Sequence, residues 1–237
     1  MIYLDNAATT YPKPFSVLET VYRANRKYAY NSGRGGYRES VQTAEKIFAV
    51  RDCLGRFFHC PEQNIVFTNN CTTAVNTALK GLLKPGDHVL ISALEHNAVF
   101  RPIYKLAREG RITFDQVPYH PDPDRFLQNI RALEQPNTAM VAMLHASNVF
   151  GVVHPLGLVG DYCRRKGWLF VVDAAQSAGI LPIDMQAMHI SALCAPGHKS
   201  LFGTMGTGVL ALAGGPPATP LTRKCRRICR IGWRQGR

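Results

Sequence analysis

Residues 168–212 read WLFVVDAAQSAGILPIDMQAMHISALCAPGHKSLFGTMGTGVLAL, and this stretch determines the fold that we expect. It holds three apolar runs bounded by turn residues, and each is typical of a strand: 168–174, 192–195 and 208–212. Between residues 185 and 222, Lys199 is the sole Lys, Arg, Asp or Glu. Because lysines are normally solvated surface residues, a single ammonium between an apolar strand and a glycine-rich turn requires a chemical explanation.

Outward from this stretch, strands and helices alternate along the chain. Four more apolar runs are typical of strands, at 64–69, 88–92, 111–117 and 139–147. Patterns typical of helices lie at 40–58, 72–83 and 156–167. This alternation predicts an α/β fold with a mostly parallel seven-stranded sheet and helices on both faces. In such sheets, ligands bind beyond the carboxyl ends of the strands.

The ends of two predicted strands carry the first candidate site residues. Asp173 and Gln176 end one strand, and Lys199 follows the next. If these strands are parallel neighbours, Asp173 and Lys199 emerge at the same edge. Burial there shifts the pKa of each group unless a ligand or a partner satisfies it. On these two residues alone, a structural ion pair is an equally acceptable interpretation.

A candidate anion site lies at the start of the predicted helix 72–83. Free backbone N–H groups and the helix dipole attract phosphate beside Thr72 and Thr73, although these residues alone are more often simple caps. A lysine, a carboxylate and a phosphate site together suit pyridoxal phosphate, whose aldehyde forms a Schiff base with lysine and whose ring nitrogen needs an acid. His96 is a candidate to stack on that ring, whereas a lone histidine at a strand end is more often structural.

Seven motifs, in this order, resemble class V aminotransferases. They are IYLDNAATT (2–10), NSGRGGYR (31–38), FTNNCTTAVNTAL (67–79), LEHNAVFRP (94–102), HASNVFGVVHPL (145–156), VVDAAQSAG (171–179) and PGHKSLFGTMGTGVL (196–210). Within that family they are most similar to the cysteine desulfurase and selenocysteine lyase branch. For residues 1–212 the resemblance implies the large domain of the fold type I pyridoxal-phosphate-dependent transferases.

The resemblance implies a role for each residue around the cofactor ring. Lys199 forms the Schiff base and later serves as the base. Asp173 pairs with the pyridine nitrogen, Gln176 contacts the ring hydroxyl, and His96 stacks on the ring. The G-x-x-G-x-G run at 203–208 precedes a strand instead of opening a helix, so we reject a dinucleotide site there.

The resemblance also implies contacts with the phosphate and the substrate. Thr73 and Thr72 bind the phosphate, and His198 approaches it. Asn148 lies near the ring hydroxyl or the substrate carboxylate. Pro196 stands where many relatives place a phosphate-binding Ser or Thr, so we expect one phosphate hydrogen bond fewer.

The implied activity is removal of sulfur from L-cysteine, giving alanine and an enzyme persulfide, in a homodimer that can pass sulfur to an acceptor protein. Two alternatives remain open. One is another pyridoxal-phosphate-dependent aminotransferase or lyase of class V, including selenocysteine lyase. The other is a non-catalytic binding protein with a basic tail.

The resemblance stops after residue 212. Family members continue into a C-terminal small domain that carries the catalytic cysteine and an arginine for the substrate carboxylate. We therefore expect a truncated member that builds the cofactor half of such an enzyme and does not complete turnover without that domain. Whether the chain is an enzyme is left open.

Residues 213–237 form a basic tail, with seven of the 28 Lys and Arg residues and none of the acids. One interpretation is an arm for nucleic acid or an acidic partner, with Cys225 and Cys229 spaced for a metal. We favour a non-native or disordered tail, because charge without interleaved aromatic residues is weak evidence. Nucleic acid is therefore not an expected partner.

The remaining composition predicts a cytoplasmic protein. The seven cysteines are odd in number and scattered, which suits reduced thiols. The chain shows neither a signal peptide nor a stretch of about 18 apolar residues, so we expect no membrane association.

Overall fold

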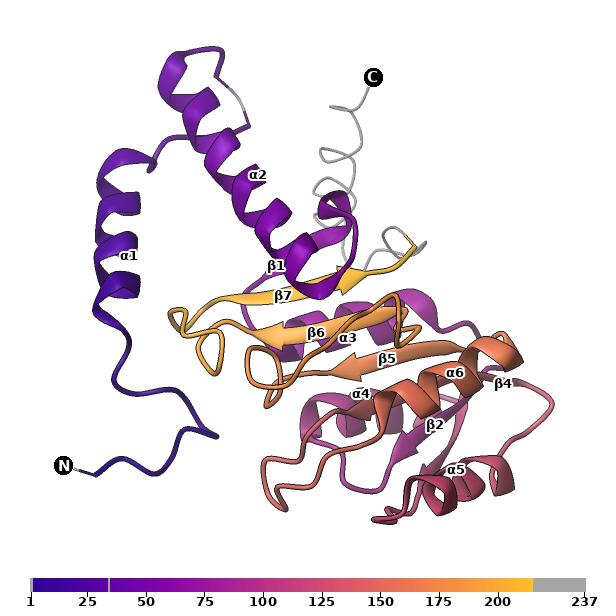
Figure 1. Ribbon diagram of the computed structural model, residues 1–237. Coiled ribbons are helices and arrows are strands. Elements are labelled where there is room, and N and C mark those ends of the chain that lie inside the picture. Colours follow the sequence, from indigo (N-terminus) through magenta and orange to yellow (C-terminus); the bar gives the residue numbers. More distant parts are fainter. Residues whose placement is uncertain (1, 34, 215–237) are drawn as a thin grey trace.

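A computed structural model describes residues 2–33 and 35–214 of the chain (Figure 1). The helices are α1 (Phe15–Lys27), α2 (Arg38–Phe58), the short 3-10 helix η1 (Glu62–Asn64), α3 (Cys71–Leu82), α4 (Asn97–Arg108), α5 (Pro123–Ala132) and α6 (Leu156–Lys166). The strands are β1 (Ile65–Thr68), β2 (His88–Ser92), β3 (Thr113–Val117), β4 (Thr138–Leu144), β5 (Leu169–Asp173), β6 (Ala192–Pro196) and β7 (Gly208–Leu212). Cys225, Cys229 and most of the predicted tail lie outside the described residues.

The seven strands form one sheet in the order β1-β7-β6-β5-β4-β2-β3, which confirms the prediction. β7 is antiparallel to β1 and β6, and the other pairs are parallel. β4 is shorter than the predicted strand 139–147, because Ala146 pairs with Val153 in an isolated bridge and the chain leaves the sheet there. β3 likewise begins at Thr113 and not at residue 111.

Helices cover both faces of the sheet, as predicted (Figure 1). Val141 and Met143 of β4 lie in a buried core together with residues of α5 and α6. Met140 and Ala142 of the same strand lie in a second core with residues of α3 and α4. Because successive side chains of a strand point to opposite faces, a strand between two helical layers must be apolar throughout.

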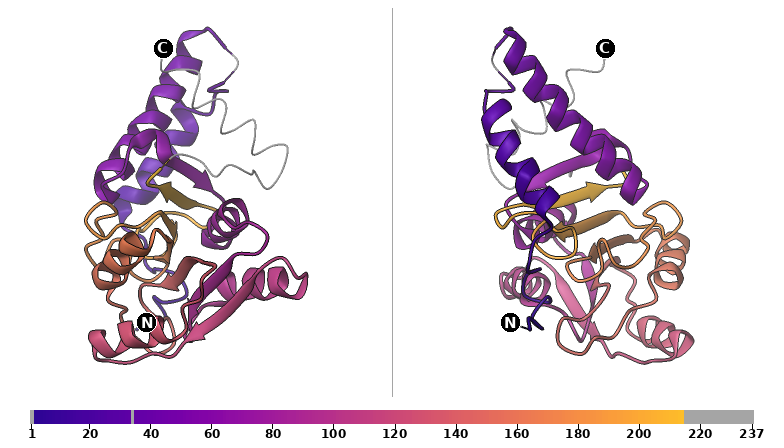
Figure 2. Two further views of the ribbon diagram at one scale, coloured as in Figure 1. Left: turned by 90° about the vertical axis from the view of Figure 1, so that its right-hand side faces the viewer. Right: turned by 60° about the vertical axis from the view of Figure 1, so that its left-hand side comes forward.

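The first two helices extend away from this sandwich of layers. In both views of Figure 2, α1 and the N-terminal part of α2 project beyond the sheet. None of the residues of α1 is buried, and Phe15, Leu18 and Tyr22 are exposed. The molecule therefore presents a helix with exposed apolar side chains and no buried residue.

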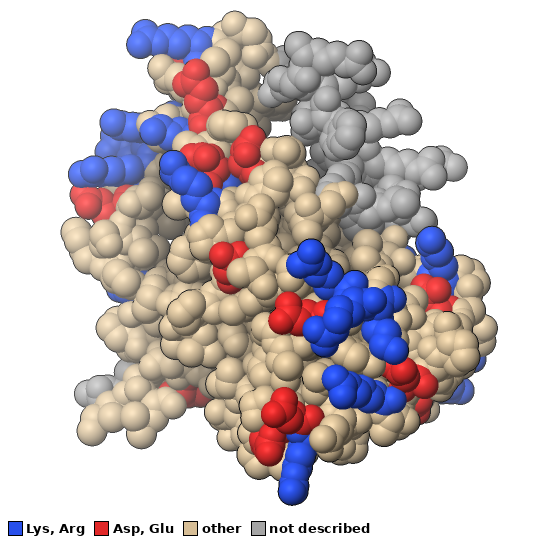
Figure 3. All heavy atoms as spheres, turned by 45° about the vertical axis from the view of Figure 1, so that its right-hand side comes forward, with Lys and Arg blue, Asp and Glu red and all other residues tan. Residues whose placement is uncertain are grey.

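Charged side chains lie intermixed on the face shown in Figure 3, where Lys and Arg form one group with acids around it. At the C-terminal ends of α5 and α6, Arg131, Arg165 and Lys166 lie over the Tyr162 ring. Cations at helix C-termini are stabilised by the helix dipole.

Over the described part of the chain, no helix has the length and apolar character that a bilayer crossing requires.

Candidate active site

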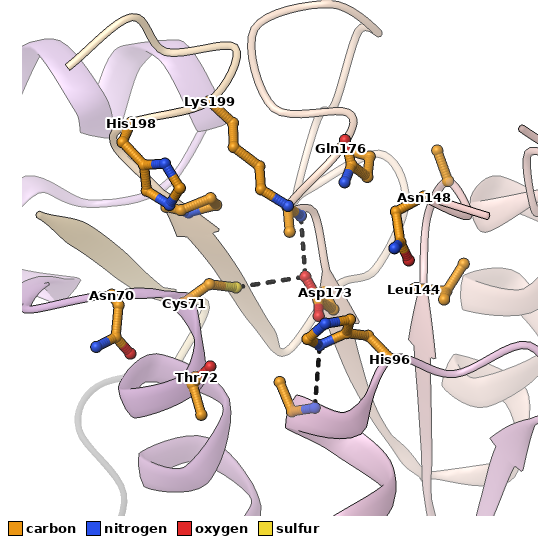
Figure 4. A pocket seen from close by; sticks show the side chains of 14 residues that line it. Asn70, Cys71, Thr72, His96, Leu144, Asn148, Asp173, Gln176, His198 and Lys199 are labelled. Atoms are coloured by element: carbon orange, nitrogen blue, oxygen red, sulfur yellow. Dashed lines mark hydrogen bonds between the residues drawn. The ribbon is translucent and has the colours of Figure 1, made fainter. Parts of the chain in front are cut away.

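A pocket lies at the carboxyl ends of the parallel strands (Figure 4). β3 and β4 follow β2 in the sequence, and they flank it on opposite sides. The strand order therefore reverses at β2. Open α/β sheets bind ligands beside such a reversal, at the carboxyl ends of the strands. The lining residues are Asn70, Cys71, Thr72, His96, Ala98, Leu144, Ala146, Asn148, Asp173, Ala175, Gln176, Pro196, His198 and Lys199. Seven of the eight candidate residues are among them, and the eighth, Thr73, is not.

Lys199 enters the pocket from the turn after β6, and its side chain extends toward Asp173 (Figure 4). The side chain is half-buried, and the loss of water lowers its pKa, although the charges of Asp173 and Cys71 act in the opposite direction. Among the described residues, no ion pair joins Lys199 to Asp173 or to another acid. The amine thus remains available for a ligand, and the ion-pair interpretation has no support in this geometry.

Asp173 ends β5, which is the parallel neighbour of β6, as expected. Its side chain is buried, and burial raises the pKa of the carboxyl group. Oδ1 accepts hydrogen bonds from the Ala175 backbone N–H at 2.9 Å and from the Cys71 thiol at 3.3 Å. Both bonds end on Oδ1, and no residue in the described part of the chain donates to Oδ2, which is therefore available to the pocket.

The N-terminus of α3 faces the same pocket. Asn70 caps the helix, since its Oδ1 accepts a hydrogen bond from the Thr73 backbone N–H at 2.7 Å. Thr72 is exposed and lines the pocket, whereas the Thr73 side chain does not. The first turn of α3 thus offers the dipole and the Thr72 hydroxyl to an anion.

The remaining candidates surround Asp173 and Lys199. His96 caps α4, with Nδ1 accepting a hydrogen bond from the Ala98 backbone N–H at 3.1 Å. Gln176 donates from Nε2 to the Ala7 carbonyl oxygen at 2.9 Å, and Asn148 is exposed. Burial and the nearby charges of Lys199 and Lys13 lower the pKa of His198.

Sequence reasoning missed two residues that line the pocket, Asn70 and Cys71, and also the buried Glu95, which bonds the backbone of the lining residue Leu144. Asn70 has a local signal, because an Asn directly before a helical pattern is a typical N-cap. Cys71 contacts a residue 102 positions away and has no local signal. Glu95 accepts a hydrogen bond from the Leu144 backbone N–H at 2.8 Å, and burial raises its pKa to about 8.

These groups fit pyridoxal phosphate by their chemistry. An unpaired amine, a buried carboxylate with one available oxygen, and a helix N-terminus match the aldehyde, the ring nitrogen and the phosphate of that cofactor. Within the described ranges, no cluster of three or more His, Cys, Asp or Glu residues suits a metal ion.

Known proteins are similar to this chain in sequence and in fold. The family model for aminotransferase class-V matches residues 2–215. Cysteine desulfurase IscS of Shewanella baltica (strain OS223) is 34% identical over 217 residues, which cover 88% of this chain and 52% of the relative. The apo structure of cysteine desulfurase from Thermococcus onnurineus NA1 matches with a TM-score of 0.82 and 31% identity, over 90% of this chain and 54% of that one. The structure of SspA in complex with cysteine matches with a TM-score of 0.84 and 26% identity, over 94% and 65%.

The chain belongs to the class-V aminotransferase family, whose members use pyridoxal phosphate. Within that family it is similar to cysteine desulfurases, which confirms the resemblance and the fold class predicted from the motifs. The chain spans about half the length of the curated relatives it matches.

Proposed function

We propose that this chain binds pyridoxal phosphate through Lys199 and acts on L-cysteine as a cysteine-desulfurase-like protein. One observation carries the proposal: an unpaired amine and a buried carboxylate, from the ends of two parallel neighbouring strands, face one pocket. This pair suits a ligand that offers an aldehyde to one group and a ring nitrogen to the other. The similarity to cysteine desulfurases, and to SspA in complex with cysteine, supports the amino acid substrate.

Lys199 and Asp173 perform the central steps of this proposal. When bound, pyridoxal phosphate supplies an aldehyde that combines with amines and a ring that withdraws electrons from the substrate Cα. Because the pKa of Lys199 is lowered, more of its amine is unprotonated at neutral pH, so it can hold the cofactor and later take the proton from Cα. Asp173 would hold a proton at the ring nitrogen through Oδ2, since two donors engage Oδ1.

The other lining residues bind and orient. The Thr72 hydroxyl and the first turn of α3 would hold the phosphate, and His198, which lines the same pocket, would approach it (Figure 4). His96 would pack on the ring face. Gln176 would contact the ring hydroxyl, and Asn148 would bind the hydroxyl or the substrate carboxylate. We assign no phosphate contact to Thr73, because its side chain does not line the pocket.

Transfer of sulfur needs an acceptor thiol, since L-cysteine and a thiol give alanine and a persulfide. Burial raises the pKa of Cys71 and Cys194 well above the ordinary range, so both are protonated at neutral pH and react poorly. Neither is our candidate acceptor. The resemblance assigns that role to the catalytic cysteine that family members carry in a C-terminal small domain, from which a sulfur-acceptor protein can then take the sulfur.

Two further features belong to the proposal. The exposed apolar residues Phe15, Leu18 and Tyr22 support a homodimer, because such residues mark surfaces that another protein covers. The five cysteines of the described residues are free thiols, which supports a cytoplasmic location.

The test is the absorption spectrum of the purified chain with added pyridoxal phosphate, followed by borohydride reduction and peptide mapping. We expect a visible band and a reduced cofactor on Lys199, with neither in Lys199→Ala. Lys105→Ala, a change at an exposed lysine on α4, is the matched control and should keep both. Folded protein without the band would contradict the proposal.

Product analysis then separates the candidate activities. With L-cysteine and dithiothreitol as the acceptor thiol, release of alanine and sulfide in equal amounts would indicate a cysteine desulfurase. Keto acid formation would indicate an aminotransferase instead. Release of alanine from selenocysteine, with none from L-cysteine, would indicate a selenocysteine lyase.

A further inference from the structure

The segment at residues 7–13, which we call the N-terminal clamp, lies against the turn that carries Lys199. Thr9 and Thr10 are 189 positions away from the residues that they contact, so this is a contact of the folded molecule and not of local sequence. Ala7, at the start of the clamp, accepts a hydrogen bond from Gln176 of the pocket at 2.9 Å. The clamp thus contacts the segments that follow β5 and β6, the two strands whose ends carry Asp173 and Lys199.

Two consecutive carbonyl groups of the turn receive the hydrogen bonds of the clamp. The His198 oxygen accepts three: from Thr9 Oγ1 at 3.0 Å, from the Thr10 backbone N–H at 3.2 Å and from Lys13 Nζ at 2.5 Å. The Lys199 oxygen accepts one from Thr10 Oγ1 at 2.8 Å. The His198 ring joins the same contact, with Nδ1 at 3.1 Å from Thr9 Oγ1.

Besides the clamp, the turn at residues 197–207 has hydrogen bonds of its own, and two of them join Gly197 to Thr207 and Thr207 to Thr204, away from the Lys199 carbonyl group. The turn follows β6, contains no helix and includes Phe202, a residue other than glycine with a positive φ of 57°. Within the turn, the Phe202 N–H donates to the Lys199 oxygen at 2.8 Å and the Gly203 N–H to the Gly197 oxygen at 2.7 Å. Because the peptide group is planar, fixing the carbonyl groups on both sides of the Lys199 nitrogen and Cα also fixes the direction in which its Cα–Cβ bond leaves the backbone, and so the point from which the side chain starts.

We propose that Thr9, Thr10 and Lys13 are positioning residues of the active site, which aim the Lys199 amine into the pocket by holding the His198 and Lys199 carbonyl groups. The inference rests on the proposed function for its purpose, since an amine that must react with an aldehyde has to be placed in advance. The contacts themselves do not depend on any bound cofactor.

The test uses Thr10→Val, which removes one hydroxyl without changing charge or bulk. In protein free of cofactor, competitive acylation and peptide mapping give the pH at which Lys199 is half-reactive. We expect this midpoint to rise by about one pH unit in the variant, because a released side chain regains water. We also expect the Phe202 and Gly203 amide hydrogens to exchange about tenfold faster.

The matched control is Thr20→Val, whose hydroxyl bonds the Ser16 oxygen within α1 at 2.7 Å and lies away from the turn. It should change neither readout, and Thr10→Ser should restore both. An unchanged Lys199 midpoint together with unchanged Phe202 and Gly203 exchange in Thr10→Val would overturn the inference. Acylation needs no cofactor, so failure of the wild-type chain to bind pyridoxal phosphate would count against the proposed function only.

Discussion

Two buried histidines make the stability of the fold depend on pH. His145 and His154 are 6% and 1% exposed, and three of their four ring nitrogens have no hydrogen-bond partner among the described residues. Burial lowers the pKa of each to about 4. A histidine in the unfolded chain gains its proton near pH 6.5, so protons favour unfolding between pH 6.5 and 4. Each histidine therefore stabilises the fold above pH 6.5, and this contribution is lost as the pH falls to about 4.

His154→Asn tests this contribution in urea denaturation at pH 7.5 and pH 5. We expect the difference in unfolding free energy between wild type and variant to be smaller at pH 5 by about 2 kcal/mol. Comparing differences is necessary, because the raised pKa of Glu95 changes stability in the opposite direction in both proteins. Leu156→Val, a nearby buried and uncharged change, should cost the same at both pH values. An equal cost of His154→Asn at both pH values would contradict the argument.

At the scale of elements, helix α6 offers two glycines with opposite surroundings. A Cβ on Gly160 would lie 1.8 Å from the Met188 carbonyl oxygen, whereas a Cβ on Gly157 would meet no atom within 4 Å. Gly160→Ala should therefore lower the unfolding free energy by about 1–3 kcal/mol, because backbone atoms must shift. Gly157→Ala should raise it by up to about 1 kcal/mol through helix propensity. Urea denaturation measures the unfolding free energy of both variants. Equal changes in the two variants would contradict the close packing of α6 at Gly160.

The cap of α3 allows helix stability and anion binding to be separated. Asn70→Ala removes the acceptor of the Thr73 N–H and should cost about 1 kcal/mol of stability. Asn70→Asp keeps the cap but adds a negative charge beside the pocket, so it should retain stability and bind pyridoxal phosphate about tenfold more weakly. Thermal denaturation and titration with the cofactor measure the two effects. Unchanged affinity in Asn70→Asp would exclude a phosphate at this helix end.

The strands were predictable because most of them are buried on both faces and are therefore apolar throughout. β2, β6 and β7 consist of buried residues only, and their predicted ranges agree with the structure within one residue. The boundaries failed where burial stops: β3 lies at the edge of the sheet, and β4 ends where Ala146 turns away. The antiparallel direction of β7 depends on the connection at 197–207, which has no crossover helix.

At the scale of the whole molecule, the site was predictable only in part. Asp173 and Lys199 could be found because each lies within three residues of the end of an apolar strand. Cys71 and Thr10 could not, because each acts through a partner that the fold brings from more than a hundred residues away. The candidate Thr73 failed to line the pocket because the helix begins at Cys71, which orients Thr72 and not Thr73 toward the opening. The end of the large domain at residue 212 stays a prediction.

The molecule should also be unevenly stable, with the sheet and its covering helices as the stable part. α3 buries six residues against β5, β6 and β7, whereas α1 buries none. Helices shorter than about 15 residues are marginal without tertiary packing, so α1 should open without global unfolding. Amide hydrogen exchange at low protein concentration should therefore give α1 protection at least about a hundredfold below that of α3. If a second copy covers α1, its protection should rise with protein concentration while that of α3 stays constant. Equal protection of α1 and α3 at the lowest concentration would show that α1 is held by contacts within one chain, contrary to this reasoning.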